Sequence, residues 1–286
     1  MTSIAFIGFG EAARAFVDTL REVVALDVRA YDIRDDAAMR EAAAARGVTL
    51  CPDARSAIAG AEVVFSAVTA GSAGEALVTA YADPVAPHVL CDINSVSAGV
   101  KQANAARVRG AGAAYVDMAV MAPVHPAGHR TALLLAGDTG AVLPFLQAHG
   151  FRFEDLEDEA GAATSVKMVR SLFVKGLEAI TVQCLSAAVT AGCGERVMAS
   201  LAASYPGLEM PKQGAYAFER VTTHGKRRAE EVREVARTMA ELGFPEGAEL
   251  AQGIAAVQDA VAAAKSPLSE DALACARAAA AALRAR

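Results

Sequence analysis

Short apolar runs alternate with helical patterns through the first 160 residues. Continuous apolar runs of about four to eight residues between turn signals are typical of buried strands. We expect strands at 4–7, 26–31, 48–50, 62–68, 89–92, 114–120, 131–136 and 151–156, and helices at 13–24, 35–46, 55–59, 72–82, 97–109 and 139–150. This alternation predicts an α/β domain with a doubly wound, mainly parallel sheet over residues 1–160.

The pattern becomes helical beyond residue 161, with no further strand-like run. Residues 162–189 are apolar nearly all round, which is expected of a long helix buried between two domains. Residues 222–242 are amphipathic, and further helices are expected at 247–265 and from 269 to the end. We therefore expect an all-helical substrate and dimerisation domain at 161–286, joined to the first domain by the helix at about 162–189.

The first apolar run leads directly into residues 8–13, GFGEAA, which fit the pattern G-x-G-x-x-A. Gly8 permits a tight turn, Gly10 lets the backbone approach a pyrophosphate, and Ala13 lets the following helix pack close to the strand. A strand, this turn and a helix in that order favour dinucleotide binding over an ordinary glycine turn, with the pyrophosphate at the helix N-terminus. The predicted cofactor-binding residues are Gly8, Phe9, Gly10, Glu11 and Ala12.

The second part of the dinucleotide fingerprint is an acid at the end of the next strand. Asp32 stands about twenty residues beyond the glycines, where a carboxylate binds the adenosine ribose hydroxyls. Asp32 favours NAD because it would repel a 2′-phosphate, whereas Arg34 could accept that phosphate, so NADP stays open. Further cofactor contacts are expected from Ile33, Val68, Thr69 and Asn94, although ordinary turn chemistry would also explain Thr69.

Composition and charge narrow the class of protein. The chain is 54% hydrophobic with 5% aromatic residues, which indicates closely packed, alanine-rich helices. Its net charge of −6 gives no reason to expect nucleic acid as a partner. The five cysteines show no C-x-x-C spacing, so we expect free thiols in a reducing compartment.

The apolar stretch 172–189 is interrupted by Lys175, Glu178 and Gln183, so a membrane span is not expected. The first strand begins without a basic leader, so no signal peptide is expected either. We expect a soluble cytoplasmic protein. The remaining apolar faces of the helical domain predict a homodimer.

The long helix presents a polar stripe. Lys167, Ser171, Lys175 and Glu178 fall on one face, with Arg170 beside them. A desolvated lysine can act as an acid or base, which is the role expected of Lys167. We expect Lys175 to extend its ammonium to solvent.

These segments together resemble the β-hydroxyacid dehydrogenases, the family of 3-hydroxyisobutyrate and 6-phosphogluconate dehydrogenases. The resemblance rests on four segments: 8–13; CDINSVSAG at 91–99, similar to the family's D-x-S-T-x-x-P; 116–138, similar to its D-A-P-V-S-G-G stretch; and GAATSVKMVRSLFVKG at 161–176, similar to its G-x-x-x-x-x-K-x-x-N-N helix. It implies a Rossmann domain, a nicotinamide cofactor and Lys167 as catalytic acid/base.

The chain departs from the family at its substrate-binding positions. The family's Ser-Gly-Gly is replaced by a turn beginning at Met121, and its two asparagines are replaced by Arg170 and Ser171. This pattern, with the segment HGKRRAEEVREVA at 224–236, resembles a divergent phosphogluconate-dehydrogenase-like branch. We expect Arg170 to be the replacement anion-binding group. The predicted substrate-binding residues are Asn94, Ser95, Met121, Arg170, Ser171 and His224.

The expected function is hydride transfer between NAD or NADP and the carbinol carbon of a small anionic 3-hydroxy acid or sugar acid. Imine reduction or amine oxidation on the same scaffold is an alternative, because the Ser-Gly-Gly turn is lost. A catalytically silent NAD-binding regulator is another, although Lys167 argues against it. Decarboxylation after oxidation stays open. His125 and His129 flank Pro126 and Gly128, which favour a loop, and the sequence shows no third ligand nearby, so no metal is expected.

Overall fold

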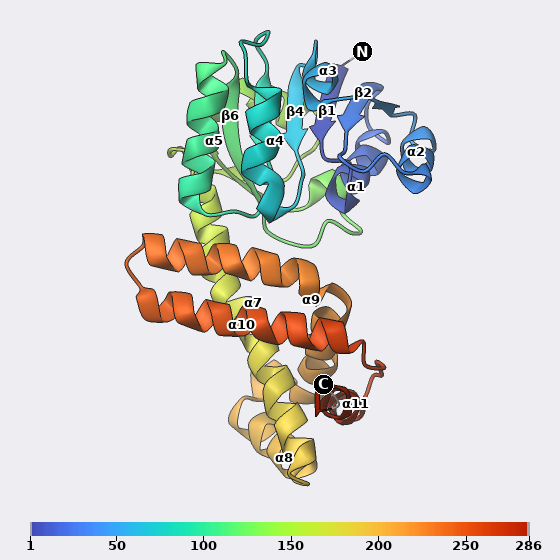
Figure 1. Ribbon diagram of the computed structural model, residues 1–286, viewed down its shortest axis with the longest axis vertical. Helices are drawn as coiled ribbons and strands as arrows, with labels where there is room; N and C mark the ends of the chain where they lie inside the picture. The colour runs from blue at the N-terminus through green and yellow to red at the C-terminus, as the bar shows by residue number, and fades with distance from the viewer. Residues whose placement is uncertain (1, 285–286) are drawn as a thin grey trace. The chain divides into compact units, whose positions relative to one another are not determined.

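A computed structural model describes residues 2–284 of the chain (Figure 1). It contains two compact units, one ending at Met168 and the other beginning at Val169. The division falls within a long helix, α7 (Ala162–Thr190), whose first two turns belong to the first unit. Each unit is described by itself below.

The first unit is built on a single sheet, in which the described residues form eight strands in the order β3-β2-β1-β4-β5-β6-β7-β8. Every neighbouring pair is parallel except β6 and β7. The mainly parallel, doubly wound sheet is therefore confirmed. The strands are β1 Thr2–Ile7, β2 Leu26–Tyr31, β3 Thr49–Leu50, β4 Val63–Ser66, β5 Val89–Asp92, β6 Ala114–Val120, β7 Leu133–Gly137 and β8 Phe153–Asp155.

Helices cover both faces of this sheet. One face packs against α1, α2 and α6 around a cluster of phenylalanines, in which the Phe6 and Phe65 rings stack at 5.2 Å. The other face packs against α3, α4 and α5 around smaller side chains and Tyr115. The helices are α1 Glu11–Leu20, α2 Ala37–Ala44, α3 Ala54–Ile58, α4 Ala73–Ala80, α5 Ala98–Gly110 and α6 Leu143–Ala148.

The first and the last of these helices are shorter than expected. The first ends at Leu20 rather than near Val24, because the chain must turn there to bring Leu26 into register with Thr2 of β1. The helix expected at 139–150 is a short 3₁₀ turn followed by α6, which has Pro144 in its first turn. Proline is well suited to that position because the N–H it lacks would have no helical partner.

The second unit is helical throughout its described residues. Its elements after α7 are α8 Gly194–Ser204, α9 Met210–Glu241, α10 Pro245–Ala264 and α11 Ala272–Arg284, and residues 285–286 of the last predicted helix lie outside the described part. Helices α9 and α10 form a closely packed hairpin (Figure 1). A Cβ at Gly225 would lie 2.4 Å from the Gln258 carbonyl oxygen, so their close approach requires glycine.

Buried ion pairs join the helices of the second unit. The expectation that Lys175 extends to solvent is wrong: the residue is 5% exposed, and its Nζ lies 2.6 Å from Glu231 Oε2 on α9. Glu178 pairs in the same way with Arg228. Burial of a lysine is tolerated here because a carboxylate accompanies it.

By length and composition alone, α7 is long and apolar enough to cross a membrane. Half of its most apolar window is buried inside the molecule, and one such helix is weak evidence of a membrane span.

Candidate active site

The glycine turn lies at the point where the strand order of the sheet reverses. Strands β2 and β4 flank β1, and ligands of doubly wound sheets bind beyond the carboxyl ends of the strands at such a point. Gly8 follows β1 with φ +90°, and a Cβ there would lie 2.5 Å from the Ala67 carbonyl oxygen. Glycine is therefore required for the turn to pass the end of β4.

The space in front of α1 is open. A Cβ built on Gly10, the N-cap of α1, meets no atom within 4 Å. The first N–H groups of a helix, here those near Ala12 and Ala13, have no acceptor within the helix and favour an anion. The N-terminus of α1 thus has the open space and the positive polarity that a pyrophosphate needs.

Asp32 connects the glycine turn to the end of β2. Its Oδ2 accepts the Phe9 N–H at 2.8 Å, and its Oδ1 accepts the Arg34 N–H at 2.9 Å. The Arg34 guanidinium lies 3.3 Å from Oδ1, and the side chain is 58% exposed. The carboxylate is therefore in place for ribose hydroxyls, and a positive charge suited to a 2′-phosphate lies beside it.

The other predicted residues of this region differ in exposure. The Phe9 ring is buried against Phe6, so Phe9 can meet a ligand only through its backbone. Ile33 is 88% exposed, and Thr69, after β4, is also exposed. Together with the open space at Gly10 and the carboxylate of Asp32, these residues fit a nicotinamide dinucleotide.

Asn94 ties the loop after β4 to the loop after β5. Its Nδ2 donates to Ser66 Oγ at 2.8 Å, and its Oδ1 accepts the Val68 N–H at 2.8 Å. The side chain is buried, with both ends of the amide used. Asn94 therefore shapes the carboxyl edge of the sheet, where the sequence predicts ligand contacts.

The long helix brings a lysine to the same edge. Lys167, in the second turn of α7, donates from Nζ to Ser95 Oγ at 2.6 Å, and both side chains are partly buried. Ser95 follows β5 by three residues. A lysine held in this way can exchange a proton with a group bound at the edge of the sheet.

A cluster of buried charges beneath Ser95 was not among the predicted site residues. Lys101, Asp92 and Asp117 are fully buried, and Lys101 Nζ lies 3.1 Å from Asp92 Oδ1 and 3.2 Å from Asp117 Oδ1. One signal in the sequence could have indicated it: Asp117 interrupts the apolar strand 114–120, where a charge needs a partner.

The remaining predicted residues are distributed over both units. Met121, in the first unit, is half-buried and packs with Ala119, Ala136 and Ala163. In the helical unit Arg170 is exposed, Ser171 is buried and His224 is half-buried. The roles of these four residues stay predictions.

The two histidines considered as metal ligands lie in different surroundings. His129 is fully buried, with Nδ1 2.7 Å from Thr19 Oγ1 and Nε2 3.1 Å from the His149 carbonyl oxygen. Burial lowers the pKa of His129. His125 is exposed. Within residues 2–284, no group of three or more His, Cys, Asp or Glu residues could hold a metal ion.

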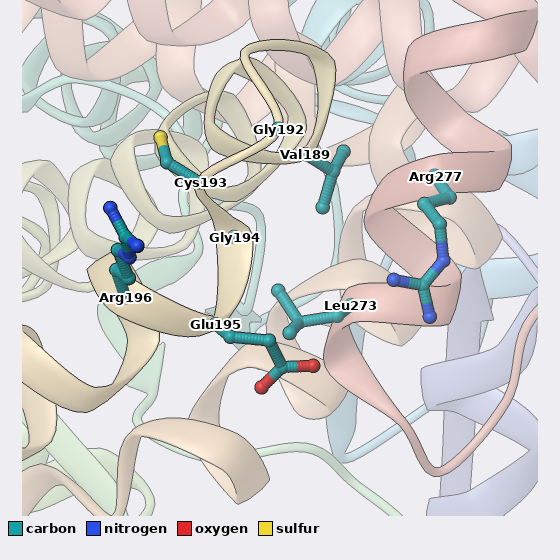
Figure 2. Close-up of a pocket in the computed structure, with 8 residues that line it drawn as sticks. All are labelled: Val189, Gly192, Cys193, Gly194, Glu195, Arg196, Leu273 and Arg277. Carbon is teal, nitrogen blue, oxygen red and sulfur yellow. The ribbon is translucent and has the colours of Figure 1, made fainter.

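A pocket of about 270 Å³ lies in the helical unit (Figure 2). Glu195 and Arg277 line it with Leu273 between them in this view, and Cys193 lies at the turn before α8. Its lining includes none of the predicted site residues.

The comparisons with known proteins cover both units. Residues 3–151 match the family model of the NAD binding domain of 6-phosphogluconate dehydrogenase, and residues 188–261 match a domain of unknown function, DUF1932. No curated protein sequence matches the chain.

Solved structures match nearly the whole chain. A conserved hypothetical protein from Sinorhizobium meliloti 1021 is 33% identical over 99% of this chain and 97% of its own, with a TM-score of 0.76. A conserved protein of unknown function, described as structurally similar to 3-hydroxyacid dehydrogenases, is 26% identical over 90% of this chain and 98% of its own, with a TM-score of 0.68.

The Mycobacterium tuberculosis 3-hydroxyisobutyrate dehydrogenase, solved with L-serine, shares the fold at 19% identity, over 100% of this chain and 99% of its own, with a TM-score of 0.72. The dinucleotide-binding model alone spans more than half of the chain. The glycine turn, Asp32 and these matches lead to one conclusion. The chain belongs to the 6-phosphogluconate-dehydrogenase-like β-hydroxyacid dehydrogenases, a family of nicotinamide-dependent oxidoreductases.

Proposed function

We propose that the protein oxidises the CH–OH group of a small 3-hydroxy acid or sugar acid, or reduces the corresponding carbonyl, with Lys167 as general acid/base. The observation that carries this proposal is the 2.6 Å hydrogen bond from Lys167 Nζ to Ser95 Oγ, beyond the carboxyl end of β5. Doubly wound sheets bind their ligands at this edge.

The chain's own contribution to the reaction is proton transfer and positioning. A bound nicotinamide supplies hydride acceptance or donation. Lys167, in its neutral form, accepts the substrate's hydroxyl proton at Nζ. In the reverse direction its ammonium returns this proton and stabilises negative charge developing on the oxygen. Such transfer contributes about 10²–10⁴-fold to the rate.

Binding of the substrate's acid group is assigned to Arg170. It follows Lys167 by three residues in α7, its side chain is exposed, and a guanidinium binds a carboxylate or phosphate with two parallel hydrogen bonds. We assign further substrate contacts to Asn94, Ser95, Met121, Ser171 and His224. Turnover of substrates without an acid group at the same kcat/KM would contradict the role of Arg170.

The proposed cofactor preference is NAD over NADP. Asp32 would repel a 2′-phosphate, and Arg34, already 3.3 Å from that carboxylate, offsets the repulsion only in part. We expect calorimetry to give a lower Kd for NAD, and Arg34→Ala to widen the difference. A Kd for NADP equal to or below that for NAD would show that Arg34 dominates.

We further propose a cytoplasmic homodimer. Apolar side chains recur at helical spacing along α7 and are 46–72% exposed: Val166, Val169, Phe173 and Ile180. A second copy of the chain would cover such a row. Light scattering should give twice the mass of 29.3 kDa, and a monomeric mass would contradict this proposal.

The test of the function is reduction of NAD and NADP, followed by absorbance, against 3-hydroxy acids, sugar acids and their phosphates. Lys167→Ala should lose about 10²–10⁴-fold in kcat/KM. Lys212→Ala, on an 82% exposed side chain of α9, is the matched control.

The other possible results of this test would favour a different base or a different function. Turnover that survives in Lys167→Ala would overturn the assigned base. Activity only with cyclic imines or amines would favour imine chemistry. Binding of NAD without turnover of any substrate would favour a regulator.

A further inference from the structure

Two buried carboxylates stand next to each other in the sheet. Asp92 and Asp117 are paired in register on the parallel strands β5 and β6, so both side chains leave the same face. Neither is exposed to solvent. Like charges repel strongly in the low dielectric of an interior, so the two carboxylates require compensation.

Lys101 supplies the compensating charge from α5. Its fully buried ammonium lies within 3.2 Å of one oxygen of each carboxylate and also donates to the Asp92 backbone carbonyl. Tyr115 donates its O–H to Asp92 Oδ2 at 2.7 Å, and Asn104 donates to the same oxygen at 3.2 Å. Burial and the Asp92 charge raise the pKa of Tyr115 well above its usual value, so the phenol stays a donor.

Asp117 holds the beginning of α7. Its Oδ2 accepts the N–H groups of Gly161 at 3.1 Å and Thr164 at 2.9 Å. A carboxylate is favoured there because the first N–H groups of a helix lack partners and the helix dipole is positive at this end. Lys167 follows Thr164 by three residues, so its backbone is placed by this cap.

Asp92 holds the loop that carries Ser95. Its Oδ1 accepts the Asn94 N–H at 3.0 Å, in the residue directly before Ser95. Thr164 joins the beginning of α7 to the loop after β5, because its hydroxyl donates to the Val96 carbonyl at 2.6 Å. Both partners of the Lys167–Ser95 hydrogen bond are thus attached to the same buried charges.

We propose that Lys101, Asp92 and Asp117 form a positioning cluster that fixes the distance and direction between Lys167 Nζ and Ser95 Oγ. Lys101 is a positioning residue, because it holds the two carboxylates that orient the loop and the helix carrying Ser95 and Lys167. This inference rests on the proposed role of Lys167.

The first test is Lys101→Met, which keeps the length of the side chain and removes its charge. Displacement of reacting groups by about 1 Å costs about 10²-fold, so we expect kcat to fall by about 10- to 100-fold with the Kd for the cofactor unchanged. The paired carboxylates should then share a proton, since both cannot stay ionised side by side.

Lys101→Met should therefore lose further activity as the pH rises and the proton shared by the two carboxylates dissociates. The wild type should not show this loss. The titratable groups facing the pair in the wild type are Lys101 from α5 and Tyr115 from β6. Burial raises the pKa of Tyr115, so the phenol does not supply this dependence at neutral pH.

The second test is rescue. In Lys101→Met/Asp117→Asn the facing charge is removed together with the ammonium, and the new amide oxygen can still accept an N–H of α7. We expect the double variant to recover most of the lost kcat and to lose the added pH dependence. A double variant no better than the single one, or a single variant with wild-type kcat, would overturn the proposal.

A milder pair of variants covers the case in which Lys101→Met does not fold. Thr164→Val removes the hydroxyl that bonds to the Val96 carbonyl, whereas Ser165→Ala removes a neighbouring hydroxyl that bonds to the Gly161 carbonyl within the same turn. We expect Thr164→Val to lower kcat about tenfold at unchanged cofactor Kd, and Ser165→Ala to leave it unchanged.

Acetic anhydride labelling of Lys167, followed by peptide mass spectrometry, gives a readout that needs no substrate. Its rate should change in Thr164→Val and not in Ser165→Ala. Equal behaviour of the two variants would overturn the positioning role. A wild type without turnover would count against the proposed function alone, because labelling still reports how Lys167 is held.

Discussion

The two units of the chain bury charge in different settings. In the first unit, Lys101 and its two carboxylates connect strands to the loop and helix that carry Ser95 and Lys167. In the helical unit, Glu178 and Arg228 connect only helices, α7 with α9. A buried ion pair costs desolvation in either setting and is retained only with its partner present.

The two settings also differ in how completely polar atoms are paired. In the helical unit, both side-chain polar atoms of the buried Gln258 and the Nε of Arg228 have no hydrogen-bond partner among the described residues. In the cluster of the first unit, Asp117 Oδ1 also has no hydrogen-bond partner among the described residues, but it lies 3.2 Å from the Lys101 ammonium, and the other three carboxylate oxygens accept hydrogen bonds. We infer that charge in the first unit orders a site, whereas charge in the second holds helices together.

The largest expected effect is on the stability of the helical unit. Glu178→Leu leaves the Arg228 charge buried without its partner, which should lower the free energy of unfolding in urea by about 3–5 kcal/mol. In the double variant Glu178→Leu/Arg228→Met, apolar side chains replace both ions, and most of the loss should be recovered. If Glu178→Leu were as stable as the wild type, the buried ion pair would not hold the helices of the second unit together.

The next effect separates two glycines of the nucleotide turn. Gly8→Ala places a Cβ against the Ala67 carbonyl at φ +90°, so it should cost about 1–3 kcal/mol from the backbone conformation, and more from the clash. Gly10→Ala meets no protein atom and should fold normally, yet weaken NAD binding by about tenfold or more. Unchanged NAD affinity in a folded Gly10→Ala protein would contradict the assigned pyrophosphate site.

Some of the features behind these predictions can be recognised in the sequence, whereas others depend on contacts that only the fold brings together. The strands could be predicted because each is a short apolar run. The nucleotide turn could be predicted because its glycines, the strand before it and the helix after it are all neighbours in the sequence. The burial of Lys175 could not be predicted, because its partner, Glu231, is 56 positions away in the sequence and on another helix. Lys101 was overlooked for the same reason, since its carboxylates come from two strands that only the fold brings together.

The helical unit was predicted less completely than the first. Helix α8 was not expected, and α9 begins at Met210, twelve residues before the predicted start at 222. Pro211 and Gly214 resemble loop residues in the sequence, but proline fits the first turn of a helix, and Gly214 allows close packing on Ala272. Residue type alone does not distinguish a proline or glycine in a loop from one within a helix.

The smallest expected effect concerns pH. Burial lowers the pKa of His129 in the folded protein, so the unfolded chain binds a proton near pH 6.5 that the folded chain does not. Stability should therefore fall as the pH drops below about 6.5. His88, also in the first unit, acts in the same direction.

His129→Gln keeps a donor for the His149 carbonyl and should flatten this dependence, measured as the urea midpoint at about pH 5 and 7. His125→Gln, at an exposed position, is the control. An equal slope in both variants would show that acid sensitivity does not arise from buried histidine in the first unit.

Lys167 is proposed to transfer the proton. Chemical rescue of Lys167→Ala by added primary amines tests it most directly, once a substrate is known from the panel. We predict that the variant is nearly inactive, still binds NAD, and regains turnover in proportion to the concentration of free-base amine, whereas the wild type does not respond. A Lys167→Ala variant that turns over at the wild-type rate, with or without amine, would show that Lys167 does not transfer the proton.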